Sequence, residues 1–380
     1  MDNIKIGTRA SKLAVWQAEQ VQTLLQTINI SSSIIKIKSS GDKDLSKPVY
    51  ELGITGVFTK EIDLALLNNE IDIAVHSLKD VPTKLPLGVM QGAVLQRGSE
   101  LDIIIPNKAL KSKENTIATG SLRRKAQWLN KFKTDNIVEI RGNVQTRLRK
   151  LNENNWNGTI MAKAGLERLD ILPKDYQDLN WMVPAPAQGA ISVQNLTLNS
   201  SITEVLKQIN HVETELCTNI ERSFLNKLEG GCTAPIGAHA KIVHSSIVFR
   251  GILLSVDGKD KIEINEVHKL DKTEDLGERL AKKIISLGGD RILNSLKMKF
   301  ESQLWSKSNF NWITLGYSII VGITLFFLLL FLKKNRISIY LNNTKITFIF
   351  LIILIFISSI PSSWSGYNHQ LLLCKGRVQH

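Results

Sequence analysis

Residues 1–300 alternate short runs of β-branched residues with stretches in which apolar side chains recur every three or four positions. Short apolar runs indicate buried strands, and the longer period indicates helices with one apolar face. The chain opens on such a pair, because a strand is expected over Ile4–Thr8 and the helical face that follows contains Leu13, Trp16 and Val21. This alternation predicts α/β units built around largely parallel sheets.

The same reading places further elements along the chain. Strands are expected over residues 34–38, 71–75, 103–105, 116–118, 137–140, 159–161, 247–256 and 262–267. Helices are expected over residues 58–67, from 122 onward, through 148–151, over 211–228 and over 273–287. Gly230-Gly231 and Gly288-Gly289 are expected to end the last two helices. The Pro184-Ala185-Pro186-Ala187 segment predicts a crossover between units.

The C-terminal part of the chain has a different pattern. No charged residue occurs from Ser308 to Leu332, and Lys333-Lys334-Asn335-Arg336 follows. Residues 312–332 are long enough to cross a bilayer as a helix, and residues 346–360 form a shorter second apolar run. A single span would place the basic cluster outside, against the usual charge bias of membrane proteins. A membrane anchor, a remnant of a fusion and a misread reading frame all stay open.

The composition limits the kinds of binding partner and the cellular compartment that are expected. The chain of 380 residues contains 48 Lys and Arg against 35 Asp and Glu, a net charge of +13 that favours an anionic partner. Its three cysteines (Cys217, Cys232 and Cys374) are too few and too scattered for a disulfide framework or a zinc site. The seven histidines are dispersed, so no metal is expected. No signal peptide precedes the first strand, which favours a cytoplasmic location for the α/β part.

Charged and hydroxyl side chains gather just past the ends of the expected strands. They are Arg9, Ser11, Lys79, Asp80, Ser121, Arg123, Arg124, Arg141 and Arg147. Open α/β sheets bind ligands at the carboxyl ends of their strands. One arginine there is usually a solvated surface residue, but several on separate loops are better explained by ligand carboxylates, which the planar guanidinium binds in bidentate geometry. The pattern predicts a cleft for a polyanion.

Two local features point to chemistry. Asp80 follows Lys79 in a loop stiffened by Pro82, although such an aspartate alone is more often the cap of a turn. Cys232 lies between Gly230-Gly231 and a Pro-Ile-Gly segment, where a second group can approach its sulfur closely, so it is the candidate for covalent chemistry. By contrast, Cys217 is expected to be a small buried hydrophobe and His76 a hydrogen-bonded core residue.

Two other functional classes remain in view. A nucleic-acid-binding protein would explain the net charge, but the basic residues are not interleaved with aromatic ones, and no phosphate-binding glycine loop occurs. A non-catalytic receptor of the periplasmic type would use the same arginine cleft. It leaves Asp80 and the Gly-Gly-Cys232 loop without a purpose, and no export signal accompanies it.

Seven segments together resemble the porphobilinogen deaminase (hydroxymethylbilane synthase) family over roughly residues 4–300. They are Gly-Thr-Arg9-Ala-Ser11-Lys-Leu-Ala, Ala-Val-His-Ser-Leu-Lys79-Asp80-Val-Pro, Gly-Ser121-Leu-Arg123-Arg124, Ile-Arg141-Gly-Asn-Val-Gln-Thr-Arg147-Leu, Ala-Gly-Leu-Glu-Arg168-Leu, Pro-Ala-Gln188-Gly-Ala and Leu-Glu-Gly-Gly-Cys232-Thr-Ala-Pro-Ile-Gly, in family order. The resemblance implies two α/β domains like those of periplasmic binding proteins, a small third α/β domain, and here a hydrophobic C-terminal tail. The implied bounds are 1–97 with 190–207, 101–184, 212–300, and 308–380 for the tail.

The resemblance also implies a transferase reaction in tetrapyrrole (haem) biosynthesis. Four porphobilinogen molecules join head to tail with release of ammonia, and water frees the linear hydroxymethylbilane. The implied cofactor is one dipyrromethane per chain, joined by a thioether to Cys232. Asp80 matches the catalytic carboxylate, which would protonate the leaving amine and stabilise cationic pyrrole intermediates. The family resemblance favours a soluble monomer, so the tail is a departure that suggests membrane association.

Further family roles follow for matched residues. Cofactor and substrate carboxylates would be held by Arg9, Ser11, Lys79, Ser121, Arg123, Arg124, Arg141, Arg147 and Arg168. Gln188 would serve as a hinge or gate on the crossover, and Phe58 would lie near the growing chain. This chain has Glu51 and Thr55 where many family members carry lysines, so this loop is expected to work differently.

Overall fold

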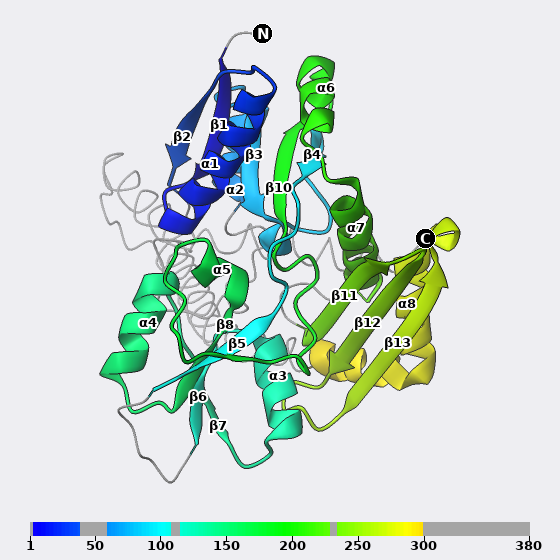
Figure 1. Ribbon diagram of the computed structural model, residues 1–380. Helices are drawn as coiled ribbons and strands as arrows, with labels where there is room; N and C mark the ends of the chain where they lie inside the picture. Colours follow the sequence, from blue (N-terminus) through cyan, green and yellow to red (C-terminus); the bar gives the residue numbers. More distant parts are fainter. Residues whose placement is uncertain (1–2, 39–58, 108–114, 229–233, 299–380) are drawn as a thin grey trace, which may run out of the picture. The chain divides into compact units, whose positions relative to one another are not determined.

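The computed structural model describes residues 3–38, 59–107, 115–228 and 234–298. Within these ranges the chain forms three β-sheets with helices packed against them (Figure 1). All three sheets belong to one compact unit. The α/β class expected from the alternating pattern is therefore confirmed.

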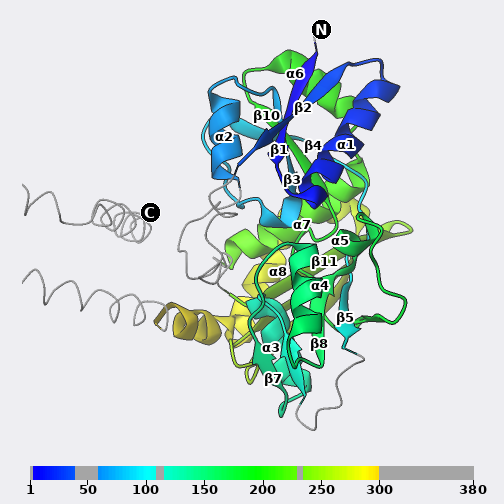
Figure 2. The same ribbon diagram turned by 90° about the vertical axis from the view of Figure 1, so that its left-hand side faces the viewer.

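The first sheet contains five strands with helices on both faces (Figures 1 and 2). Helices α1 (Lys12–Thr27) and α6 (Ser200–Gln208) share a core with the strands on one face, where Val21, Leu25 and Leu206 are fully buried. Helix α2 (Lys60–Leu67) packs through Ile62 and Leu66 in a separate core cluster. The strand order is β2 (Ser32–Ile37), β1 (Ile4–Arg9), β3 (Ile73–Ser77), β10 (Ile191–Leu196) and β4 (Val89–Val94).

The second sheet repeats this arrangement. Helix α3 (Leu122–Lys131) packs through Trp128 in one core cluster, while α4 (Val144–Glu153) and α5 (Lys163–Glu167) pack through Leu151 and Leu166 in another. The strand order is β7 (Asn136–Val138), β6 (Thr116–Ala118), β8 (Gly158–Ala162), β5 (Asp102–Pro106) and β9 (Gln177–Asp178). In both sheets the first two pairings are parallel and the last two antiparallel.

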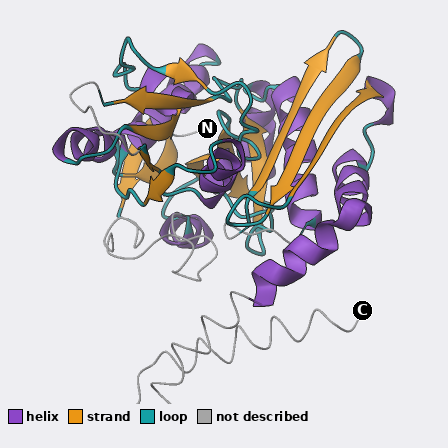
Figure 3. Ribbon diagram, turned by 90° about the horizontal axis from the view of Figure 1, so that it is seen from below, coloured by secondary structure: helices purple, strands orange, loops and turns teal. Residues whose placement is uncertain are grey.

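The third sheet is antiparallel and is covered by helices on one side (Figure 3). Helices α7 (Val212–Lys227) and α8 (Leu276–Ile284) pack on it, and the rings of Phe224 and Phe249 meet edge to face with centroids 5.2 Å apart. Such a pair adds to the burial of two large apolar side chains. The strands are β11 (Ile236–Val243), β12 (Ser246–Leu254) and β13 (Lys261–Lys269).

The expectation of largely parallel sheets is wrong, because half of the pairings in each large sheet are antiparallel. The chain leaves the first sheet after β4, builds the second, and returns through β10. The returning strand runs antiparallel to both of its neighbours, β3 and β4. The Pro184–Ala187 segment lies on this return path between β9 and β10, so the predicted crossover is confirmed.

The ends of the last helices differ in part from expectation. Gly288 adopts a left-handed φ of 97°, as a helix stop should, yet a further helical segment follows at once over residues 290–298. The glycine therefore bends the helix instead of ending it. Gly230-Gly231 lies outside the described residues, as do Glu51, Thr55 and Phe58.

Among the residues that the structure describes, no helix is long and apolar enough to cross a membrane. The two apolar runs of the tail, residues 312–332 and 346–360, lie outside the described part of the chain.

Candidate functional site

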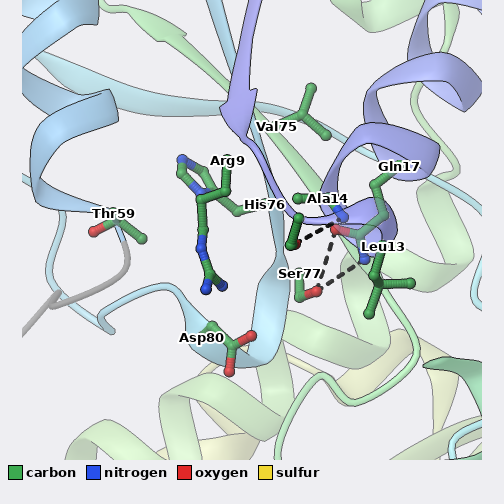
Figure 4. Close-up of a pocket in the computed structure, with 10 residues that line it drawn as sticks. Arg9, Leu13, Ala14, Gln17, Thr59, Val75, His76, Ser77 and Asp80 are labelled. Carbon is green, nitrogen blue, oxygen red and sulfur yellow. Dashed lines mark hydrogen bonds between the residues drawn. The ribbon is translucent and has the colours of Figure 1, made fainter. Parts of the chain in front are cut away.

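The carboxyl ends of β1 and β3 form a pocket at the edge of the first sheet. Arg9 ends β1, and after β3 the chain turns through a 3-10 helix, η3 (Leu78–Asp80), that carries Lys79 and Asp80. Arg9, Ser11, His76 and Asp80 line the pocket, whose volume is about 420 Å³ including its open mouth. In Figure 4 the Arg9 side chain extends from the end of β1 toward the Asp80 turn.

Helix α1 begins in this pocket. The hydroxyl of Ser11 accepts a hydrogen bond from the Ala14 N–H at 3.3 Å, so the serine is the N-cap of the helix. One turn further, the Gln17 amide donates to the Ser77 hydroxyl at 2.8 Å and fixes the helix against the end of β3. These two hydrogen bonds fix the position of Ser11 relative to the end of β3.

His76 contributes a neutral group to the pocket. Burial and then the positive charge of Arg9 lower the pKa of His76 to about 4, so its ring is uncharged near neutrality. The histidine is buried, as expected, but its Nε2 has no hydrogen-bond partner among the described residues. The expected hydrogen bond is therefore missing at that nitrogen.

The edge of the second sheet is organised around a buried carboxylate that sequence reasoning missed. Asp102 Oδ2 accepts from Arg123 Nη1 at 2.7 Å, and Asp102 Oδ1 lies 2.8 Å from Arg124 Nη2. Burial alone would raise the pKa of Asp102, but the two guanidinium charges lower it well below the usual value. Ser121 begins α3 as its N-cap and so presents both arginines to Asp102.

Gln188 connects the two edges. Its side chain is buried, donates to Asp102 Oδ1 at 3.0 Å, and accepts from Lys79 Nζ at 3.2 Å. Burial lowers the pKa of Lys79 to about 8, and the neighbouring charge of Asp80 opposes this only in part. Lys79, Gln188 and Asp102 thus form one polar chain between the sheets. The hinge role expected for Gln188 stays a prediction.

Arg124, Arg141 and Arg147 form a cationic group beside this chain. Burial, and after it the charges of Arg124 and Arg141, lower the pKa of Arg147 to about 10. Arg147 donates from Nε to the Gly142 carbonyl at 2.8 Å. Mutual repulsion of this kind is relieved when a bound anion sits among the cations.

Arg168 has a different setting. Its Nη2 donates to the Gly189 carbonyl at 2.6 Å, and its guanidinium lies 5.5 Å from the centroid of the Trp16 ring. Burial lowers its pKa to about 10. The contacts of Arg168 therefore join α5 to the crossover and to α1.

The chemistry of these side chains fits a polycarboxylate ligand. The charge of Asp80, which is exposed, acts on Lys79, Arg124 and Arg147, so this carboxylate lies within a mainly cationic environment. Cys232 lies outside the described residues. Cys217 is buried in α7, as expected, and burial raises the pKa of its thiol to about 11.

A second buried carboxylate was also missed from the sequence. Glu221 of α7 is fully buried and accepts from Arg97 Nη1 at 2.6 Å, Ala187 N at 2.6 Å and Ala240 N at 2.7 Å. It joins the third sheet to the crossover. The sequence did contain a sign that both carboxylates are buried. Glu221 falls on the apolar face of its helix with Cys217 and Phe224, and Asp102 immediately precedes a run of isoleucines in a buried strand.

Comparison with known proteins gives consistent matches over the described α/β part. The family model "Porphobilinogen deaminase, dipyromethane cofactor binding domain" matches residues 4–204, and "Porphobilinogen deaminase, C-terminal domain" matches residues 215–286. Among solved structures, the methionine-binding protein MetQ aligns over 58% of this chain and 93% of its own at 12% identity and a TM-score of 0.36, a likeness too weak to bear on function.

Curated relatives agree with the family models. The porphobilinogen deaminase of Syntrophomonas wolfei is 38% identical over 302 residues, which is 77% of this chain and 98% of the relative. The probable porphobilinogen deaminase of Methanocaldococcus jannaschii is 41% identical over 294 residues, 74% of this chain and 99% of the relative. With both family models matched in order along its length, the chain belongs to the porphobilinogen deaminase family, transferases of tetrapyrrole synthesis that use a dipyrromethane cofactor.

Proposed function

We propose that this chain condenses four porphobilinogen molecules into hydroxymethylbilane, with Asp80 as the acid–base group and the surrounding cations as carboxylate ligands. The proposal rests on the position of Asp80. Its charge acts on Lys79 at the edge of the first sheet and on Arg124 and Arg147 at the edge of the second. Each pyrrole of the substrate carries an acetate and a propionate group. A growing oligopyrrole is therefore a polycarboxylate, for which such a site is suited.

The cofactor supplies the terminal pyrrole to which the first substrate is joined. We assign its carboxylates, and those of the substrate, to Arg9, Ser11, Lys79, Ser121, Arg124, Arg141 and Arg147. Arg123 and Arg168 belong to the same proposal; Arg123, like Arg124, also binds Asp102, and Arg168 binds the Gly189 carbonyl. Phe58 and Gln188 keep their proposed roles beside the growing chain and at the crossover.

Asp80 would handle the proton balance of each condensation. The amino group of porphobilinogen leaves as ammonia once its nitrogen is protonated, and the carboxylate then stabilises the positive charge left on the substrate's pyrrole. A carbon–carbon bond to the terminal ring would then form, and that ring would lose its proton to a base. We assign to Asp80 the donation of the first proton and the acceptance of the last.

The domain division also remains a proposal. We assign the two large sheets to domains 1–97 with 190–207 and 101–184, which bind the polycarboxylate, and the third sheet to domain 212–300, which carries Cys232. We also propose a monomer as the working unit. We place this catalytic part in the cytoplasm.

Asp80→Asn should lower kcat by about a hundredfold or more, because the variant can neither donate nor accept the proton. Steady-state turnover of porphobilinogen tests this, and the Ehrlich colour reaction should show that dipyrromethane is still attached. Asp72→Asn is the matched control, since Asp72 lies just before β3, at its opposite end, where its carboxylate accepts from the Lys5 N–H at 2.7 Å. Normal turnover by Asp80→Asn would rule out the assigned role.

Cys232→Ser should abolish attachment of the cofactor and with it all turnover. Intact mass of the purified protein measures the attachment directly. Cys217→Ala provides the control, because Cys217 is buried and its raised pKa of about 11 keeps it a thiol, so this variant should retain the full adduct mass. A wild-type chain with the bare mass, no colour reaction and no turnover would instead support a non-catalytic receptor.

The value of kcat/KM should fall as the pH rises above about 8, the pKa to which burial lowers Lys79. The lysine is cationic below this pKa and neutral above it, so its attraction for substrate carboxylates is present on the acid side and lost on the alkaline side. Lys79→Arg should remove this alkaline limb, because arginine keeps its charge. An unchanged limb in Lys79→Arg, with Lys163→Arg as control, would contradict the assignment.

We further propose that the apolar tail attaches the chain to a membrane, supported by the uncharged run from Ser308 to Leu332. After cell lysis, full-length protein should sediment with membranes in high salt and dissolve only in detergent. A chain ending at residue 303 should stay in the supernatant with the same kcat. Full-length protein in the high-salt supernatant would refute the anchor and leave the enzymatic proposal intact.

A further inference from the structure

Helix α7 is hydrogen-bonded to the turn that carries Asp80. The guanidinium of Arg222 donates from Nη1 to the Val81 carbonyl at 2.9 Å and to the Leu78 carbonyl at 3.3 Å, and from Nη2 to the Pro82 carbonyl at 2.7 Å. These three carbonyls flank Asp80 on both sides along the chain. A single arginine thus holds the main chain of the whole turn.

The surroundings of Arg222 make this contact strong. Burial lowers its pKa to about 10, which still leaves the group charged at neutral pH. Hydrogen bonds from a charged donor are stronger than neutral ones, and more so away from water. One helical turn further, the Thr83 hydroxyl lies 3.2 Å from the Asn226 side-chain oxygen, so the same face of α7 touches the turn a second time.

The helix is itself held fixed relative to the crossover. Its neighbouring residue, Glu221, accepts hydrogen bonds from Arg97, from the Ala187 N–H and from the Ala240 N–H. Helix α7 is therefore anchored on one face to the crossover and to the third sheet, and on the adjacent face to the Asp80 turn. The sequence continues from this helix toward Cys232.

The Asp80 side chain has little support of its own. It is exposed, and within the described ranges no hydrogen bond is seen to its carboxylate. The turn is closed by the Val81 N–H to Leu78 carbonyl bond at 3.2 Å and by the Leu78 N–H to Ala190 carbonyl bond at 3.0 Å. The direction of the carboxylate therefore depends on the main chain of residues 78–82.

We propose that Arg222 is a positioning residue for Asp80: from the third sheet's helix it holds the Leu78–Pro82 turn so that the carboxylate stays aimed at the reacting carbon–nitrogen bond. This inference rests on the catalytic role proposed for Asp80. Because the guanidinium of Arg222 is engaged by three main-chain carbonyls of the turn, it acts on the chemical step and not on substrate affinity. Small displacements of a reacting group cost large factors in rate.

The test compares Arg222→Met, Arg222→Lys and a control, Arg250→Met, in the full-length holoenzyme. Methionine keeps much of the apolar volume and removes every donor, while lysine keeps one charged donor. Arg250 is a matched control because it also donates to main-chain carbonyls of another sheet's segment, Trp181 at 2.8 Å and Asn180 at 3.3 Å, away from Asp80. Measured quantities are kcat, KM, the dipyrromethane content and amide exchange of residues 78–83.

Arg222→Met should lower kcat by about tenfold to a hundredfold with KM within twofold of wild type and the cofactor retained. Amide exchange should quicken at residues 78–83, and Arg222→Lys should recover part of kcat. Arg250→Met should keep kcat, whatever it does to the melting temperature. If Arg222→Met does not fold, Arg222→Lys and Asn226→Ala are compared in its place, with the same loss of kcat expected in smaller measure.

Unchanged kcat in the Arg222 variants would overturn the inference, and so would a raised KM at normal kcat or an equal loss of kcat in Arg250→Met. These outcomes are separable from failure of the proposed function. An inactive Asp80→Asn with a fully active Arg222→Met removes the positioning role alone. An active Asp80→Asn removes both.

Discussion

The site depends on one buried ion cluster, in which Asp102 binds two arginines at the junction of two sheets. The carboxylate is fully buried and binds Arg123, Arg124 and, through a neutral amide, Gln188. Withdrawing such charges from water is expensive, so each of them needs the others to stay in place. The cluster therefore holds Arg123 and Arg124 of the second sheet beside Lys79 and Asp80 of the first.

Buried carboxylates also join the third sheet to the other two. Glu221 plays there the part that Asp102 plays between the large sheets, because it too binds an arginine and a group of the crossover, the Ala187 N–H. The crossover residue Gln188 contacts both systems, since its carbonyl accepts from Arg97 at 2.8 Å while its side chain reaches Asp102. Movement of any one sheet relative to the others would alter this small set of polar contacts.

Sequence reasoning succeeded where a pattern is local and failed where distant segments meet. The strand ends that carry Arg9, Asp80 and Ser121 were predicted because a short apolar run followed by polar residues can be recognised from the local sequence alone. Strand β10 was missed, since its buried Ser192, Gln194 and Asn195 look like loop residues. Asp102 and Glu221 were missed as functional residues, because their arginine partners are brought to them only by the tertiary fold. Helix α7 was expected, but its hydrogen bonds to the Asp80 turn were not, because they join residues about 140 positions apart.

The place of β10 also constrains when the first sheet can be completed during synthesis of the chain. This strand lies between β3 and β4 in the first sheet, yet it is synthesised after every strand of the second. The second sheet is built from one continuous stretch of chain, so its contacts close shorter loops and can form earlier. The first sheet, although its initial strands emerge first from the ribosome, stays open down its middle until residue 196 has been made. The first sheet, which carries one ligand-binding edge, can therefore be completed only after the whole second sheet has been synthesised.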